Sequence, residues 1–244
     1  MNLENKIIVV TGGNGLLGKS ILNEIRKNKG IGICGDINVN ESKNYDHYLD
    51  ITDESSVNRL IEKLINKYGK IDGWVNNAYP RTDNWGESIE DLTLRSWKKN
   101  IDMHLGGYFM CCQKILKQMK TQKKGSLINM SSIYGIVGPD FNIYDGTNLT
   151  NSVEYSAIKG GLINLSRYLA SYYGKYNVRV NCISPGGVFD SQPEPFYTNY
   201  KKKVPMGRMA LPNDISPSVC FLLSDVSNYI TGHNLVIDGG WTAI

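Results

Sequence analysis

The sequence has no long hydrophobic run among its 244 residues. Nothing approaches the roughly 20 consecutive apolar residues that span a bilayer. The start, MNLENKIIVV, also has no apolar stretch long enough for a signal peptide. We therefore expect no membrane partner, and we predict a cytoplasmic protein.

The sequence lacks the cysteine and histidine spacings that form disulfide frameworks or zinc sites. The five cysteines are an odd number, Cys111 and Cys112 are adjacent, and none stands in a C-x-x-C motif. The three histidines are scattered. A disulfide framework and a zinc site are both disfavoured, so we expect reduced core cysteines and no metal.

Charge of one sign is also scarce. The 27 basic and 23 acidic residues leave a net charge of +4, spread along the chain without a basic stripe. A basic stripe with interleaved aromatic residues is the usual mark of a nucleic-acid binder, so no nucleic-acid partner is predicted. Hydrophobic residues make up 41% of the chain, which is enough for a sizeable core and argues against global disorder.

Short apolar runs alternate with amphipathic helical patterns along the whole chain. Strands that are apolar on both faces and alternate with helices imply a parallel sheet covered on both sides. Right-handed crossovers then give a doubly wound sheet. Strands are expected at 6–10, 31–36, 45–50, 71–78, 126–132, 178–184 and 234–240, and helices at 15–28, 53–68, 93–120, 154–175 and 213–224. We predict a single α/β domain over residues 1–244, a Rossmann fold with a doubly wound parallel β-sheet and helices on both faces.

Three stretches interrupt this rhythm and are expected to be loops. They run from about 79 to 88, from 138 to 153 and from 185 to 207. Long loops in a compact domain are often lids or binding loops. In this fold, ligands bind outside the carboxyl ends of the strands, so these segments are the expected substrate loops.

The segment TGGNGLLG, residues 11–18, joins the first expected strand to the first helix. Glycines let the backbone approach a pyrophosphate, and the helix N-terminus attracts its charge. Asp36 ends the second expected strand, where a carboxylate suits the adenosine ribose hydroxyls and repels a 2′-phosphate. No arginine or lysine lies within 11–18 to offset that repulsion. The prediction is NAD as cofactor and NADP as the alternative, unless Asp36 is only a turn residue after Gly35.

Residues 154–161 read EYSAIKGG, with Tyr155 and Lys159 four positions apart. On a helix these positions share one face. An ammonium group beside a phenol favours the phenolate and lowers the tyrosine pKa, which makes proton exchange near neutral pH easier. Taken alone, the spacing also fits two residues that merely share a surface face.

Several motifs together resemble the short-chain dehydrogenase/reductase family, in its shorter single-domain branch. They follow the family's order over essentially the whole chain: TGGNGLLG, Asp36, LDIT (49–52), NNA (76–78), INMSS (128–132), YSAIK (155–159), N-x-I-S-P-G (181–186) and VIDGG (236–240). The resemblance implies an NAD(P)-dependent enzyme that interconverts a secondary alcohol and a ketone. It also implies a homotetramer or dimer built on the helices at 93–120 and 154–175 and on the final strand, with Trp241 near the interface.

By this resemblance, the catalytic residues are Ser132, Tyr155 and Lys159. Ser132 would hydrogen-bond the substrate oxygen. Tyr155 would act as the acid/base that gives a proton to this oxygen or takes one from it. Lys159 would lower the pKa of Tyr155 and hold the nicotinamide ribose. Cofactor contacts are expected from Gly12, Asn14, Gly15, Leu16, Leu17, Gly18, Asp36, Asp50, Ile51, Asn77, Ala78, Tyr79, Tyr155, Lys159, Pro185, Gly186 and Val188.

Four positions depart from the family pattern. His104 stands where the family has an asparagine that supports a bound water; it either keeps that role, brings its own titration, or is a tolerated substitution. Leu16 replaces a glycine, and the resulting G-x-x-G-x-x-G resembles that of extended-branch sugar-nucleotide epimerases. Tyr79 replaces a glycine and so either narrows the cleft or decorates its wall. Asp190 replaces a threonine that often contacts the carboxamide, and Ser191 is the candidate substitute.

The segment between Ser132 and Tyr155 is longer than the family norm and rich in short polar side chains. Substrate contacts are expected from Arg81, Trp85 and Tyr144, with Arg81 gripping a phosphate or carboxylate. These features favour a polar, sugar-like substrate, phosphorylated or nucleotide-linked forms included, in carbohydrate or surface-polysaccharide metabolism. Two alternatives stay open: an NADPH-dependent ketone or 3-oxoacyl reductase, and a cofactor-binding regulator without turnover.

Overall fold

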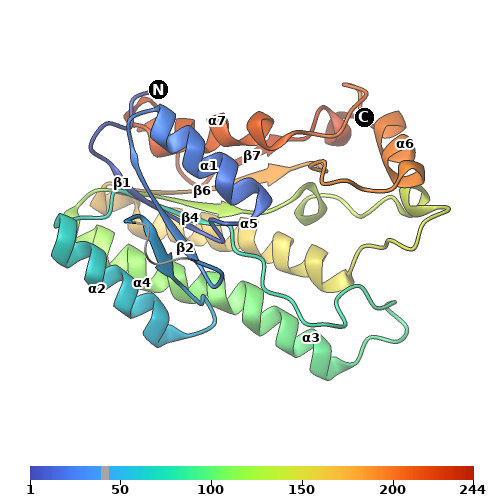
Figure 1. The fold of residues 1–244 in the computed structure, drawn as a ribbon, viewed down its shortest axis with the longest axis horizontal. Coiled ribbons are helices and arrows are strands. Elements are labelled where there is room, and N and C mark those ends of the chain that lie inside the picture. Colours follow the sequence, from blue (N-terminus) through green and yellow to red (C-terminus); the bar gives the residue numbers. More distant parts are fainter. Residues whose placement is uncertain (40–43) are drawn as a thin grey trace.

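The computed structural model describes residues 1–39 and 44–244. Seven parallel strands form one sheet in the order β3-β2-β1-β4-β5-β6-β7. The strands are β1 Ile7–Thr11, β2 Ile31–Asp36, β3 Asp46–Tyr48, β4 Gly73–Asn76, β5 Gly125–Met130, β6 Val178–Pro185 and β7 Asn234–Ile237. The chain moves outward from β1 to β3 and then returns to the other side of β1 through β4 (Figure 1). The predicted doubly wound α/β fold is therefore confirmed.

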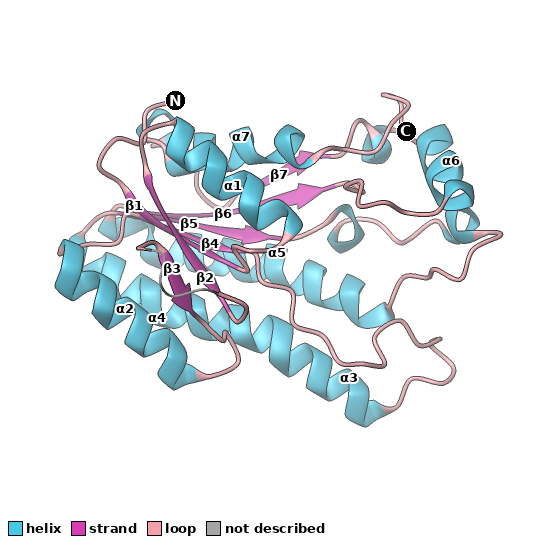
Figure 2. Cartoon of the chain, viewed as in Figure 1, coloured by secondary structure: helices cyan, strands magenta, loops and turns pink. Residues whose placement is uncertain are grey.

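Helices cover both faces of this sheet (Figure 2). On one face α1 Leu16–Lys27 packs against α7 Pro212–Leu223. The other face is covered by α2 Glu54–Tyr68, α4 Gly107–Gln122 and α5 Val153–Tyr173. The remaining helices are α3 Leu94–Ile101, α6 Glu194–Lys203, a π-helical turn at Asp102–Gly106, and 3₁₀ turns at Ile133–Gly135, Phe141–Tyr144, Gly174–Tyr176, Asp225–Ser227 and Trp241–Ala243.

The apolar run of β1 shows why the strands read as hydrophobic on both faces. Successive side chains of a strand point to opposite faces. Ile7 and Val9 accordingly join the core under α2, α4 and α5, whereas Ile8 and Val10 join the core under α1 and α7. Burying each such side chain fully contributes about 1.5–3 kcal/mol. No helix in the described ranges is long and apolar enough to cross a membrane.

A third, smaller apolar cluster lies outside the two sheet faces. It joins the loop after β5 to α6 and the C-terminal turn, through Ile143, Phe196, Tyr200 and Trp241. Trp241 is only 9% exposed and stacks on Tyr200 with ring centroids 4.7 Å apart. The Trp241 ring therefore packs mainly within the chain, and its expected place near a subunit interface stays a prediction.

Several predicted boundaries need correction. The helix expected at 93–120 is α3 and α4 joined by the π-helical turn, and the segment 185–207 is not a plain loop, since it contains α6. In α6, Glu194 lies in the first turn and three lysines lie in the last, an arrangement that suits the helix dipole. The strand expected at 234–240 ends at Ile237, because Gly239 and Gly240 both have positive φ.

Candidate active site

A cleft of about 780 Å³ opens at the carboxyl ends of the central strands. The switch point between β1 and β4 lies beneath it, which is where doubly wound folds bind ligands. The predicted residues that line it are Gly12, Gly15, Leu16, Leu17, Asp36, Asp50, Ile51, Asn77, Ala78, Tyr79, Arg81, Trp85, Ser132, Tyr144, Tyr155, Lys159, Pro185, Gly186 and Val188. Asn14 and Gly18 lie outside the lining. The sequence motifs thus converge on one cleft.

The glycine turn forms one end of the cleft. Gly12 has a φ of +63°, and a Cβ there would meet the Ala78 Cα at 2.7 Å. A Cβ at Gly18 would collide with the carbonyl oxygen of Gly12, so Gly18 allows α1 to pack closely on the turn. The N-cap residue of α1, Gly15, offers no side chain to the first amides of the helix. Unpaired helix amides attract anions, so this turn fits a dinucleotide pyrophosphate.

Asp36 is held beside the glycine turn by two backbone amides. Its Oδ2 accepts from Asn14 N at 3.0 Å and its Oδ1 from Asn38 N at 2.9 Å. The Asn14 side chain in turn donates to the Asn38 carbonyl. Asn14 therefore orients Asp36 rather than lining the cleft. Within the described part of the chain, Arg81 and Lys159 are the only lysine or arginine side chains that line the cleft.

Thr11 joins the glycine turn to the loop after β4. Its Oγ1 accepts from the amides of Asn77 and Ala78 at 2.9 and 3.0 Å, and the side chain of Asn77 donates to the carbonyl oxygens of Thr11 and Gly12, both at 3.1 Å. Thr11 is fully buried and lies outside the predicted set of site residues. Its position at the last residue of β1, just before the glycines, is the sequence signal for this role.

Tyr155 and Ser132 meet at the centre of the cleft. Burial raises the pKa of Tyr155, and a hydrogen bond with Ser132 opposes that rise. The expected fall in the tyrosine pKa is therefore not found in this structure. The physical reason is that the phenol lies deep in the cleft among protein atoms, and desolvation disfavours the charged form of an acid.

Lys159 is enclosed beside Tyr155 and is only 4% exposed. Its Nζ donates to the Met130 carbonyl at 2.8 Å and lies 5.4 Å from the ring centroid of Tyr155. The rings of Tyr79 and Tyr108 also lie within 5.9 Å of Nζ. Burial lowers the pKa of Lys159 to about 7, while the surrounding ring faces stabilise its charged form.

His104 lies in the π-helical turn and is fully buried. Its Nε2 is 3.5 Å from the Lys159 Nζ, and its Nδ1 has no hydrogen-bond partner among the described residues. Burial, followed by the nearby Lys159, lowers the pKa of His104 well below its usual value. The imidazole is thus neutral near physiological pH, and the alternative that His104 adds its own titration there is not supported.

Aromatic rings surround the far end of the cleft. Tyr79 makes edge contacts with Trp85 and Tyr155 at centroid distances of 5.5 and 5.8 Å, and Arg81 lies over the Tyr79 ring at 5.4 Å. The Tyr144 ring lies 5.3 Å from that of Phe196. Lining residues outside the predicted set include Tyr134, Gln192, Phe196, Tyr200 and Met209. The helix that carries two of them, α6, was not foreseen.

Of the two candidates for the carboxamide contact, Asp190 and Ser191, only Asp190 lines the cleft. Asp190 lines the cleft, and its amide donates to Gln192 Oε1 at 2.7 Å. Ser191 is exposed, has a φ of +57°, and lies outside the lining. Asp190 and Gln192 are therefore the residues at this position in the cleft.

Comparison with known proteins identifies the class. The chain matches the family model described as "Enoyl-(Acyl carrier protein) reductase" over residues 37–242. It is 39% identical to "Post-translational flagellin modification protein A" of Campylobacter coli, over 98% of this chain and 99% of that protein. It is 31% identical to the 3-oxoacyl-[acyl-carrier-protein] reductase FabG of Thermotoga maritima, again over 98% and 99%.

Solved structures agree with these matches. A short chain dehydrogenase from Leptospira borgpetersenii with bound NAD+ superposes with a TM-score of 0.88 at 34% identity, covering 99% of this chain and 94% of that one. ElxO with NADP bound superposes with a TM-score of 0.85 at 25% identity, covering 98% and 99%. The chain belongs to the short-chain dehydrogenase/reductase family. It is an NAD(P)-dependent oxidoreductase acting on CH–OH groups.

Proposed function

We propose that this oxidoreductase uses NAD to interconvert a secondary alcohol and a ketone on a polar, sugar-like substrate, phosphorylated or nucleotide-linked forms included. The supporting observation is the lining of the cleft beyond Tyr155. There Trp85 and Tyr144 line the cleft together with Arg81 and Asn151. Rings that stack on sugar faces, together with convergent polar groups, favour a polyhydroxylated ligand over an acyl chain. The match to a flagellin modification protein supports a role in glycan metabolism by association only.

The proposed chemistry assigns one task to each of three side chains. When bound, the nicotinamide gives or takes the hydride. In the reducing direction, Ser132 donates a hydrogen bond to the ketone oxygen, and Tyr155 gives that oxygen its proton. Lys159 stabilises the phenolate that remains. In the oxidising direction, Tyr155 takes the proton of the substrate hydroxyl. Its raised pKa keeps the phenol protonated near neutral pH, which is the form that the reducing direction requires.

Asp36 supports NAD over NADP. Its carboxylate lines the cleft beside the glycine turn, and the two described cations that line the cleft belong to the substrate loop and the catalytic helix. A ribose 2′-phosphate placed near Asp36 would face a like charge without compensation from the described lining. The remaining cofactor contacts follow as proposals from the lining residues named above.

The first test is a fluorescence titration with NADH and, separately, NADPH. We expect NADH to bind at least about tenfold more tightly, and Asp36→Ser to shrink that ratio. Asp46→Ser, on the neighbouring strand β3 and outside the cleft lining, is the matched control. A wild-type preference for NADPH would overturn the role of Asp36. Turnover is then screened with keto sugars and sugar phosphates, and Arg81→Ala should raise KM only for the phosphorylated compounds.

A second candidate is a 3-oxoacyl reductase that uses NADPH. The match to the Thermotoga maritima reductase supports it, as do the apolar side chains of Ile133, Phe196 and Met209 in the lining. Reduction of an acetoacetyl thioester with NADPH, faster than reduction of any keto sugar with NADH, would favour this candidate. A regulator without turnover is no longer proposed, because the chain belongs to an oxidoreductase family.

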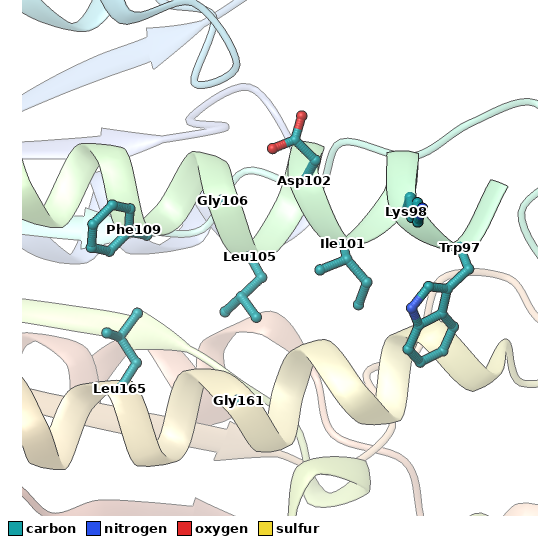
Figure 3. A pocket seen from close by; sticks show the side chains of 9 residues that line it. All are labelled: Trp97, Lys98, Ile101, Asp102, Leu105, Gly106, Phe109, Gly161 and Leu165. Carbon is teal, nitrogen blue, oxygen red and sulfur yellow. The ribbon is translucent and has the colours of Figure 1, made fainter. Parts of the chain in front are cut away.

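We also propose self-association through the outer face of α3, α4 and α5. A hollow of about 480 Å³ lies between these helices, and Figure 3 shows Trp97, Ile101 and Leu105 directed toward α5. Phe109 at its edge is half exposed. Light scattering should report a dimer or tetramer, and Phe109→Glu should reduce its mass. The cytoplasmic location stays a prediction, supported by five free, buried cysteines.

A further inference from the structure

A buried chain of polar side chains connects the loop 79–86 to the first turn of α5. Its centre is Glu154, which is 1% exposed and forms no ion pair with any described residue. The carboxylate accepts from Asn100 Nδ2 at 3.0 Å and from Ser152 Oγ at 2.5 Å. Burying a carboxylate is unfavourable unless it is hydrogen-bonded, and its place in the first turn of a helix adds favourable dipole interaction. Glu154 therefore depends on these two donors.

The far end of the chain lies in the substrate loop. Asn100 is fully buried, and its Oδ1 accepts from Thr82 N at 3.1 Å. The Thr82 hydroxyl lies 3.1 Å from the same oxygen and 2.7 Å from Asn84 Oδ1. A hydroxyl has one hydrogen, so it serves one acceptor at a time. Thr82 is next to Arg81 and three residues before Trp85, so Asn100 holds the middle of this loop.

The near end of the chain lies beside the proposed catalytic residue. Ser152 is the N-cap of α5, and its hydroxyl accepts from Tyr155 N at 3.4 Å. The serine that caps the tyrosine helix thus also donates to Glu154. Across the cleft, the ring centroid of Trp85 lies 6.3 Å from that of Tyr155. The polar chain therefore connects the loop that carries Trp85 to the helix that carries Tyr155.

We propose that Asn100 and Glu154 are positioning residues that hold the Arg81–Trp85 loop in place over Tyr155. Neither residue lines the cleft, and they act through Thr82 and Ser152. A polar substrate held between Trp85 and Tyr155 would lose affinity when this loop moves. The effect on substrate rests on the proposed function, whereas the effect on the loop rests on the hydrogen bonds alone.

The first arm of the test measures amide hydrogen exchange in the complete protein. Asn100→Leu replaces the side-chain amide by an apolar group of similar volume, so the hydrogen bonds to Thr82 and Glu154 are both lost. We expect the amide hydrogen exchange rate of residues 79–86 to rise roughly tenfold or more. Ser126→Ala is the matched control, because its buried hydroxyl donates only to Leu222 O at 2.9 Å, at the other end of the sheet. That variant should leave 79–86 unchanged. Unaltered exchange of 79–86 in Asn100→Leu would overturn the proposal.

The second arm separates positioning from general destabilisation. Thr82→Val removes the hydroxyl at constant shape and Thr82→Ser keeps it. With a substrate that the wild type turns over, Asn100→Leu should raise KM roughly tenfold, Thr82→Val less, and Thr82→Ser should restore it. NADH affinity should stay within about twofold of the wild-type value. A parallel loss of NADH binding, or a fall in kcat alone, would contradict positioning. A wild type that turns over nothing would instead count against the proposed function, and the exchange arm would still decide the loop.

Discussion

The two ends of the cleft are built in different ways. At the glycine end, short turns follow directly from strands β1, β2 and β4, and side chains bond to main-chain groups of the neighbouring turn, as Thr11 and Asn77 illustrate. At the substrate end, side chains from three segments far apart in sequence meet, held by the small apolar cluster around Tyr200 and by the buried chain through Glu154. The first end depends on the sheet, and the second on loops that the sheet does not constrain. The following substitutions probe this difference, from the largest expected effect to the smallest.

The largest effect should come from the point where the two ends meet. Tyr155→Phe removes the proton donor and leaves the ring contacts with Tyr79 and Trp85. We expect kcat to fall about 10²- to 10⁴-fold, while NADH still binds. Steady-state rates and the fluorescence titration check this together. Retention of more than a tenth of the activity would refute the assigned role of Tyr155.

At the glycine end, a matched pair of Gly→Ala substitutions distinguishes the cost of a positive φ from the cost of a steric clash. Gly12 and Gly69 both have positive φ, but a Cβ at Gly69 meets no atom within 4 Å. Gly69→Ala should cost about 1–2 kcal/mol of stability and leave NADH binding unchanged. Gly12→Ala adds the collision with Ala78 and should weaken NADH binding about tenfold or more. Equal NADH affinities of the two variants would mean that the turn does not hold the cofactor.

The direction of the reaction should change its pH dependence. Because burial raises the pKa of Tyr155, the phenol stays protonated from neutral to mildly alkaline pH. Reduction should be nearly independent of pH there, whereas oxidation should rise by up to about tenfold per pH unit. Lys159, with a pKa lowered to about 7, loses its charge above that value, so the oxidative rise should be shallower. Rate profiles in both directions between pH 6 and 10 check this, and a flat oxidative profile would contradict it.

The smallest effect is expected at the surface of the substrate end. Lys203 in α6 pairs with Asp140 at 2.7 Å, and the two side chains are 50% and 23% exposed. Exposed pairs of this kind contribute about 0–1 kcal/mol, so Lys203→Ala should change KM by less than about twofold. Lys202→Ala, in the same helix turn and without an ion pair among the described residues, is the control. A tenfold rise in KM for Lys203→Ala alone would show that this pair closes the cleft.

The glycine end was the more predictable of the two. TGGNGLLG and Asp36 lie where a parallel sheet must place them, since each comes at the carboxyl end of a strand in the alternating pattern of strands and helices. Even there, the part played by Thr11 and Asn14 needed coordinates, because side-chain-to-backbone bonds leave little periodic signal.

The substrate end was only partly predictable. Arg81, Trp85 and Tyr144 do line the cleft, but α6 was expected as loop, and the stacking of Trp241 on Tyr200 was not expected. In the sequence, Asn100 and Glu154 look like ordinary polar residues on two separate helices. Their meeting depends on how α3 and α5 pack, a contact between residues 54 positions apart that no local pattern encodes.

By itself, the sequence determined the doubly wound sheet, the family and the set of residues at the carboxyl ends of the strands. It did so because apolar period, glycine turns and the alternation of strands with helices are local patterns along the chain. Tertiary structure alone decided the charge states around Tyr155 and the enclosure of Lys159 and His104. Those depend on how completely surrounding elements exclude water, and desolvation is a property of the packed molecule rather than of any segment.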